Sequence, residues 1–207
     1  MRQDFVYLAS ASPRRHQLLK QIGVSFQVLN VEIDESISPN ESPLAYVTRL
    51  AAAKAGAGLC QSEAGASLGR PVLAADTAVV IDGEILGKPR DGEDGHRMLR
   101  LLSGRTHEVL TAVALATRDG LASRVSRSEV TFRAIGLAEA RDYWDTGEPC
   151  DKAGGYAIQG YGAVFVADMR GSYSGVMGLP LYETAEFLRS AGVSLWGPVH
   201  LGGADEH

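Results

Sequence analysis

Four polar side chains that can bind phosphate lie close together near the start of the chain, at Ser10, Ser12, Arg14 and Arg15. The residues before them are apolar and indicate a short buried strand, and Pro13 suits the first position of a helix. The two arginines then fall in the first helical turn, where the helix dipole favours anionic side chains. A bound anion would offset this placement, since hydroxyls, guanidiniums and free N–H groups all bind phosphate. A solvated basic turn is the alternative.

A single carboxylate, Asp76, interrupts the most apolar segment of the chain, Val72–Ile81. The segment predicts a buried strand, in which a carboxylate is costly unless it is hydrogen-bonded, protonated, paired or bound to a metal. We interpret Asp76 as a general base or a metal ligand, with an aspartate that caps a neighbouring loop as the alternative. Glu35, beside Asp34 at the end of another predicted strand, is a second candidate ligand because divalent cations prefer oxygen, although most such acidic pairs are simply solvated.

Two lysines are placed where they can bind an anion. Lys54 falls on the apolar stripe of a predicted helix that begins near Leu44, so its ammonium should emerge beside the core. A lysine near a helix end also often extends its ammonium into solvent, which is the alternative. Lys88 lies between a glycine and a proline directly after a predicted strand, and these neighbours restrict its backbone.

Residues 147–162 are rich in glycine and form a candidate binding loop. Glycine lets a ligand approach the backbone closely, Lys152 can contact phosphate, and the amide of Gln159 can both donate and accept at the edge of a base. The stretch matches neither a Walker A loop nor the dinucleotide-binding glycine fingerprint. A flexible surface loop is the alternative.

Hydrophobic periodicity places these residues on an α/β framework. Ser12 and Asp91 are expected to cap helices with their side chains, residues 172–178 to form a turn, and His107 to lie on a strand surface or to be hydrogen-bonded. The predicted strands cover residues 5–9, 24–31, 72–81, 84–86, 107–116, 121–133 and 163–167. The predicted helices begin at or near residues 13, 43, 92, 137 and 181.

Composition limits the function. The 207 residues carry a formal net charge of −5, which argues against a general nucleic-acid or membrane-surface binder. No apolar run approaches the ~18 residues of a membrane span, and we infer no targeting segment. Cys60 and Cys150 are isolated and fit no metal-ligand spacing, so a reducing cytoplasm is the expected setting.

Eight short motifs, in order from about residue 6 to residue 192, resemble those of the Maf family of nucleoside triphosphate pyrophosphatases. The resemblance implies an elongated α/β fold with a mixed sheet, similar to the house-cleaning inosine triphosphate pyrophosphatases, with two lobes around a central cleft. It also implies one domain over residues 1–192, a flexible tail over 193–207, and often a homodimer. The motifs are Ser10-Ala11-Ser12-Pro13-Arg14-Arg15, Arg49-Leu50-Ala51 with Lys54-Ala55, Ala75-Asp76-Thr77, Gly87-Lys88-Pro89, Leu102-Ser103-Gly104 with His107, Asp151-Lys152-Ala153-Gly154, Gln159-Gly160, and Gly178-Leu179-Pro180.

The resemblance also implies roles for matching positions. Asp76 matches the proton acceptor of the family and, with Glu35, the place of a Mg²⁺ or Mn²⁺ ion. Arg14, Thr77 and Gln159 match positions tied to base choice in members that act on dTTP and UTP. The positions that match the remaining polar side chains of the cleft, among them the catalytic lysines Lys54 and Lys88, are Ser10, Arg15, Glu35, Lys54, Lys88 and Lys152.

The expected reaction is metal-dependent attack of water on the α-phosphorus of a nucleoside triphosphate, which releases pyrophosphate and a monophosphate. A related branch of the family that acts on 7-methyl-GTP differs where this chain has Ile158-Gln159-Gly160, and the residues found here favour pyrimidine substrates. The other reading is a nucleotide-binding regulator of septum formation without turnover. Asp76 argues against this reading, because binding alone gains nothing from a carboxylate beside phosphates.

Overall fold

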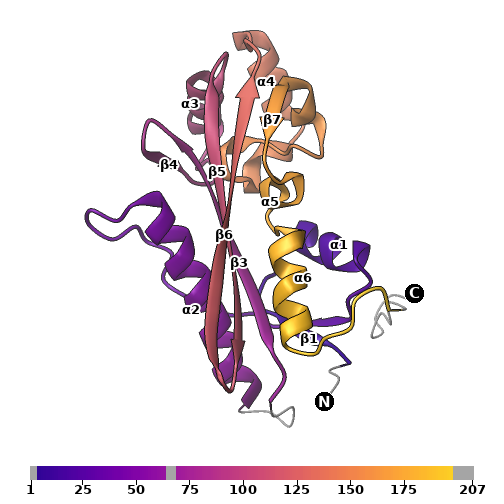
Figure 1. Ribbon diagram of the computed structural model, residues 1–207. Coiled ribbons are helices and arrows are strands. Elements are labelled where there is room, and N and C mark those ends of the chain that lie inside the picture. The colour runs from indigo at the N-terminus through magenta and orange to yellow at the C-terminus, as the bar shows by residue number, and fades with distance from the viewer. Residues whose placement is uncertain (1–3, 64–68, 198–207) are drawn as a thin grey trace, which may run out of the picture.

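A computed structural model describes residues 4–63 and 69–197 of the chain and contains one mixed sheet flanked by helices (Figure 1). The strands are β1 (Val6–Leu8), β2 (Phe26–Val28), β3 (Val72–Ile81), β4 (Glu84–Leu86), β5 (Thr106–Thr117), β6 (Gly120–Phe132) and β7 (Val166–Arg170). The α-helices are α1 (Pro13–Gln21), α2 (Pro43–Glu63), α3 (Gly92–Leu102), α4 (Leu137–Asp145), α5 (Tyr173–Met177) and α6 (Leu181–Ser190). Three short 3₁₀ helices are η1 (Glu148–Asp151), η2 (Ala153–Gly155) and η3 (Tyr161–Phe165).

The seven strands follow the order β2-β1-β3-β5-β6-β7, and β4 pairs with β3 off this path. β1 is parallel to both β2 and β3, whereas β3, β5, β6 and β7 form an antiparallel series. The sheet is therefore mixed, as predicted.

One edge of β3 is shared by two short strands that do not meet. β1 pairs with Val72 and Leu73, and β4 pairs with residues 79–81. Between them, residues 74–78 have no strand partner on that edge in the described part of the chain. β1 runs parallel to β3 and β4 runs antiparallel to it, so the loops that follow β1 and β4 both arrive at this open edge. Asp76 and Thr77 lie there.

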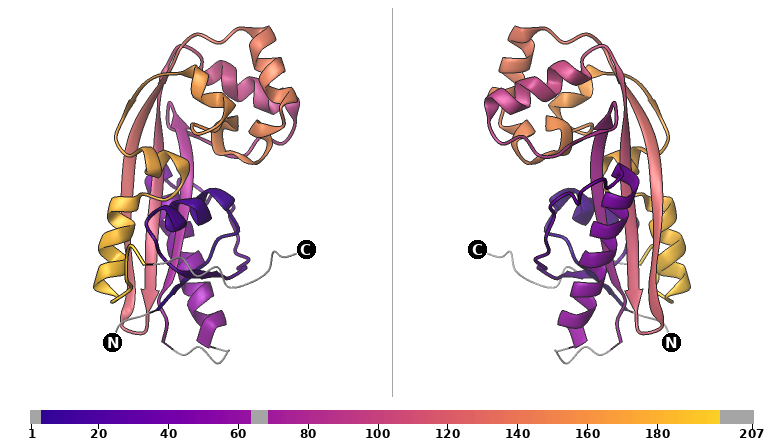
Figure 2. Two further views of the ribbon diagram at one scale, coloured as in Figure 1. Left: turned by 90° about the vertical axis from the view of Figure 1, so that its right-hand side faces the viewer. Right: turned by 90° about the vertical axis from the view of Figure 1, so that its left-hand side faces the viewer.

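The long strands join two lobes. Figure 2 shows α3 and α4 at one end of the long strands and α1, α2 and α6 at the other. One apolar cluster, with Phe132, Phe165 and Leu99, forms the core of the lobe that contains α3 and α4. Two others cover the two faces of the opposite half of the sheet, one beneath α1 and α6 and one beneath α2. In the described residues no helix is both long enough and apolar enough to cross a membrane.

Four local predictions were wrong or too broad. Ser12 stands at the start of α1, but its side chain makes no capping hydrogen bond. The second strand covers only residues 26–28 of the predicted 24–31. Residues 161–165 form η3, so the last strand begins at Val166, and the expected turn at 172–178 contains α5, which Ser172 caps.

The beginning of the expected tail is attached to the fold. Val193 is buried, and the backbone N–H groups of Trp196 and Gly197 donate to the carbonyls of Ile22 and Gly23 at the end of α1. Residues 198–207, on which the rest of the predicted tail falls, lie outside the described residues.

His107 is part of the core and is not a surface residue of its strand. The ring is 2% exposed, and Nε2 lies 2.8 Å from the hydroxyl of Tyr156. Edge-to-face contacts with Phe132 and Tyr156 enclose it further. Because burial disfavours the charged ring, the pKa of His107 is lowered from 6.5 to about 4.

Acid should therefore destabilise the fold through His107. The unfolded chain binds a proton at this residue below about pH 6.5 and the folded chain only near pH 4, so this stabilisation is complete above pH 6.5 and is lost as the pH falls through 4. The loss amounts to about 3 kcal/mol in the free energy of unfolding. Urea unfolding of wild type and His107→Gln at pH 7 and pH 4 measures it. The difference between the two proteins should shrink at pH 4; a constant difference would contradict the assignment.

Candidate active site

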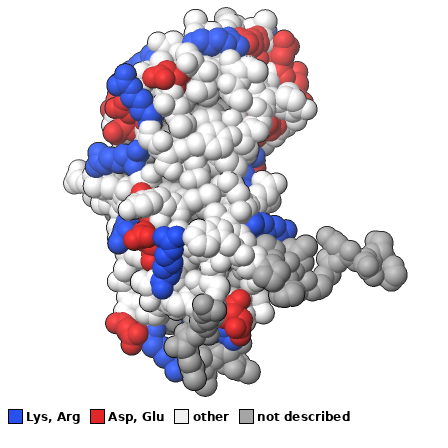
Figure 3. Space-filling view, turned by 45° about the vertical axis from the view of Figure 1, so that its right-hand side comes forward, with Lys and Arg blue, Asp and Glu red and all other residues white. Residues whose placement is uncertain are grey.

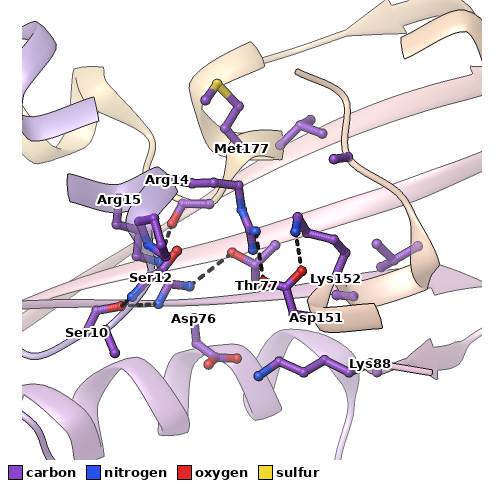
Figure 4. Close-up of a pocket in the computed structure, with 18 of the residues that line it drawn as sticks. Ser10, Ser12, Arg14, Arg15, Asp76, Thr77, Lys88, Asp151, Lys152 and Met177 are labelled. Carbon is purple, nitrogen blue, oxygen red and sulfur yellow. Dashed lines mark hydrogen bonds and ion pairs between the residues drawn. The ribbon is translucent and has the colours of Figure 1, made fainter. Parts of the chain in front are cut away.

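A cleft of about 690 Å³ opens between the two lobes at the uncovered edge of β3. On the face drawn in Figure 3, Lys and Arg side chains are interspersed with Asp and Glu, and no broad basic surface appears there. The cleft, in contrast, gathers cations around one buried carboxylate (Figure 4). All the residues singled out from the sequence line it: Ser10, Arg14, Arg15, Glu35, Lys54, Asp76, Thr77, Lys88, Lys152 and Gln159.

Asp76 meets the ammonium of Lys54 on the α2 side of the sheet. Lys54 Nζ lies 2.7 Å from Asp76 Oδ1 and 2.6 Å from Glu35 Oε1, so one cation links the two carboxylates. The side chains of Lys54 and Asp76 are only 13% and 11% exposed. Figure 4 shows the side chain of Lys88 extending toward Asp76 from the other lobe.

The surroundings of the two carboxylates push their proton affinities apart. Burial raises the pKa of Asp76, and the opposing effects of Lys54 and Arg15 do not cancel this rise. Burial acts in the same direction on Glu35, but the hydrogen bond and charge of Lys54, together with Lys88 and Arg15, outweigh it and lower the pKa. A carboxylate with raised proton affinity is suited to accept a proton, whereas its partner stays ionised.

Arg15 is half-buried and connects three parts of the chain. Its guanidinium donates to the carbonyl of Gly178 at 2.8 Å, to Ser10 Oγ at 3.0 Å and to Thr77 Oγ1 at 3.5 Å. All three acceptors are neutral, and burial lowers the pKa of the guanidinium. Thr111 extends the network, since its hydroxyl lies 3.0 Å from that of Thr77.

An ion pair crosses the cleft. Arg14 on α1 lies 3.7 Å from Asp151 in η1, and Lys152 also pairs with this carboxylate. Asp151 belongs to one of the family motifs but had no predicted role. Its position beside a predicted phosphate-binding lysine was the signal that it would share the cleft.

The remaining wall is apolar and was not predicted from the sequence. Gln159 is exposed at this end, and its amide has no hydrogen-bond partner among the residues that the structure describes. Alternation along β3 could have identified Val79 as one of these lining residues, because it lies two positions after Thr77. The others come from distant segments. The apolar wall consists of Val79, Val109, Tyr156, Ile158, Val176 and Met177.

Asp76 and Glu35 suit a divalent cation whose remaining coordination positions are filled by a bound ligand and by water. Their carboxylates already share one cation, the Lys54 ammonium, so the pair is arranged to hold positive charge. The described residues contain no group of three or more His, Cys, Asp or Glu side chains placed to hold a metal. Two carboxylates nevertheless agree with Mg²⁺ chemistry, in which phosphate oxygens and waters supply the remaining ligands.

Stability should separate the roles of Asp76 and Lys54. Lys54→Met leaves two carboxylates without their shared cation and should lower the free energy of unfolding by roughly 1–3 kcal/mol. Asp76→Asn removes a charge that burial disfavours and should cost less. Urea unfolding of both variants at pH 7.5 tests this, and the double variant should regain stability relative to Lys54→Met. An Asp76→Asn protein that is the less stable of the two would contradict this account.

Comparison with known proteins shows the family of the chain. The family model described as "Maf-like protein" matches residues 5–191. A protein from Saccharophagus degradans named dTTP/UTP pyrophosphatase is 54% identical over 191 residues, which cover 92% of this chain and 90% of that protein. One of the same name from Pseudoalteromonas translucida is 53% identical over 89% of this chain and 96% of its own length.

A solved structure from Mycobacterium abscessus, titled nucleoside-triphosphatase / dITP/XTP pyrophosphatase, is 17% identical with a TM-score of 0.43. The match covers 95% of this chain and 99% of that chain. Family membership rests on the sequence matches, which extend over nearly the whole chain. The chain belongs to the Maf family.

Proposed function

We propose that this protein hydrolyses nucleoside triphosphates, dTTP and UTP foremost, to the monophosphate and pyrophosphate. The observation that carries the proposal is the buried carboxylate of Asp76 in a cleft lined by cations from both lobes. Such a site suits a highly charged anion and places a proton acceptor beside it. The names of the relatives from Saccharophagus degradans and Pseudoalteromonas translucida support the same activity and the same substrates.

The side chains on the Asp76 face of β3 divide the chemical work. Asp76 orients a water molecule toward the α-phosphorus and accepts its proton, which its raised pKa favours. Lys54 and Lys88 offset the charge that develops on the departing pyrophosphate. A Mg²⁺ or Mn²⁺ ion held by Asp76 and Glu35 would neutralise phosphate charge when bound.

The other end of the cleft suits the base. Its wall is apolar, and Gln159 lies at its edge with both a donor and an acceptor available. Thymine and uracil present the same pair of groups, O4 and N3–H, whereas cytosine presents the reverse pattern. Arg14 on α1 and Thr77 on β3 also line the cleft and contribute to the choice of base.

Release of pyrophosphate from a panel of nucleotides tests the function. The panel holds dTTP, UTP, dCTP, CTP, 7-methyl-GTP and the common purine triphosphates, each with Mg²⁺ or Mn²⁺. Highest kcat/KM for dTTP and UTP is expected. Preference for 7-methyl-GTP would assign the chain to the other branch of the family, and nucleotide binding without turnover would favour a regulatory role.

Asp76→Asn should abolish turnover while nucleotide binding persists, because the amide keeps the shape of the side chain but cannot accept the proton. We expect kcat for dTTP to fall by about 10²–10⁴-fold. Steady-state kinetics and calorimetric binding of dTMP measure the two effects separately. A variant that keeps more than about a tenth of the wild-type kcat, a difference of about 1.4 kcal/mol in the barrier, would exclude Asp76 as the general base.

Gln159→Glu should reduce kcat/KM for dTTP and UTP, because the donor to O4 is replaced by an acceptor. The wild type should prefer dTTP over dCTP by at least about tenfold, and this preference should decrease in the variant. Gln159→Asn, which retains the amide on a shorter side chain, is the matched control for charge. The same substrate ranking in wild type and Gln159→Glu would show that this residue does not read the base.

A further inference from the structure

We propose that Glu148 positions the segment that carries Gln159 and thereby sets the discrimination between bases. Glu148 acts together with Tyr143, and we refer to these two residues as the loop clamp. The clamp contacts backbone groups on both sides of Gln159 and does not itself line the cleft. The inference rests on the proposed function, since it assigns Gln159 to the base.

Glu148 uses both carboxylate oxygens to hold the chain after Gln159. Oε2 accepts from the backbone N–H of Tyr161, and Oε1 accepts from that of Gly162, each at 2.9 Å. Oε1 also accepts from the hydroxyl of Tyr143 at 2.7 Å. Burial raises the pKa of Glu148, but these hydrogen bonds outweigh it and lower the pKa, so the side chain stays a charged acceptor.

Tyr143 holds the chain before Gln159. Its hydroxyl donates to Glu148 and accepts from the backbone N–H of Ala157 at 3.2 Å. The ring is buried and packs edge-to-face on Phe165, with 5.0 Å between the ring centroids. The segment is therefore fixed two residues before and two residues after Gln159.

Two glycines show how closely the segment passes the clamp. Gly160 has φ −117°, so it does not lie in the left-handed region that favours glycine. A Cβ at this position would nevertheless fall directly on Oε2 of Glu148. At Gly162, a Cβ would lie 2.7 Å from the hydroxyl of Tyr143. The clamp therefore excludes a side chain at Gly160, and at Gly162 the backbone of Ala157 excludes it together with the clamp.

The position of the Gln159 amide depends on this backbone. The side chain is exposed and makes no hydrogen bond to any residue that the structure describes, so no neighbour fixes it from the side. Loosening the clamp should therefore impair recognition of the base more than the chemistry at Asp76, which is held by β3 and α2.

The central variant is Glu148→Gln. It keeps the size of the side chain but replaces one acceptor oxygen by an NH₂ group, which then faces a backbone N–H. The ratio of kcat/KM for dTTP to that for dCTP should fall at least about fivefold, mainly through a higher KM for dTTP. Hydrogen exchange of the Tyr161 and Gly162 amides should become faster.

Gly160→Ala disturbs the clamp from the loop side and should change the same ratio in the same direction. Adding Glu148→Ala removes the atoms that the new methyl group meets, so the methyl group should cause less additional loss in this background than in the wild type. Asp91→Ala is the control for general destabilisation in the same lobe, because Asp91 caps α3 and does not contact the loop. It should leave the ratio of dTTP to dCTP unchanged.

The outcomes are distinct. Unchanged amide exchange in Glu148→Gln would overturn the clamp, and faster exchange with an unchanged base ratio would overturn its role in recognition. If Asp91→Ala changed the ratio equally, the change would be a consequence of lost stability, and this would also overturn the proposal. A wild-type protein that cleaves neither dTTP nor UTP would refute the proposed function instead, and amide exchange would still report whether Glu148 holds the loop.

Discussion

The cleft depends on the interrupted edge of β3. β1 pairs with the first residues of this strand and β4 with its last, which leaves residues 74–78 uncovered on one side. The opposite edge pairs with β5 along nearly its whole length, so the strand remains rigid where it is open. Unpaired strand edges invite association with other chains. Here the loop with Ser10 and the loop with Lys88 converge on the edge, and it becomes a binding site enclosed by the two lobes.

Strand alternation then divides this site into two parts. Asp76 faces α2, where Lys54 neutralises it, and Thr77 faces the opposite side, where Arg15 contacts it. Under the proposed function, these two adjacent residues contribute to different parts of the site, Asp76 to proton transfer and Thr77 to recognition of the base. β3 fixes the separation of Asp76 and Thr77, whereas the position of Gln159 depends on the loop that Glu148 holds.

The sequence predicted best what depends on local periodicity. The strand 72–81 and its costly carboxylate were located correctly because apolar runs and burial of charge are local signals. Hydrogen-bond partners were not predictable in this way. Two of the three acceptors of Arg15, Gly178 and Thr77, lie on segments distant in sequence. The helix α5 appeared as a turn because Ser172 and the Thr111 hydroxyl stabilise a stretch of low helical propensity. Ser12 occupies the N-cap position of α1, but its side chain makes no capping hydrogen bond.

Three cations of the cleft, Arg14, Lys54 and Lys152, pair with carboxylates of the chain itself. Lys54 is held by Asp76 and Glu35, and Asp151 pairs with both Arg14 and Lys152. Lys88 makes no hydrogen bond or ion pair with the residues that the structure describes, so it can contact an entering triphosphate without losing a partner. Under the proposed function, Lys152 exchanges the carboxylate of Asp151 for a phosphate, which lowers the net gain from this contact. Such an exchange favours a triphosphate over the monophosphate product, because three phosphate groups can replace more of the carboxylates that pair with the cations of the cleft.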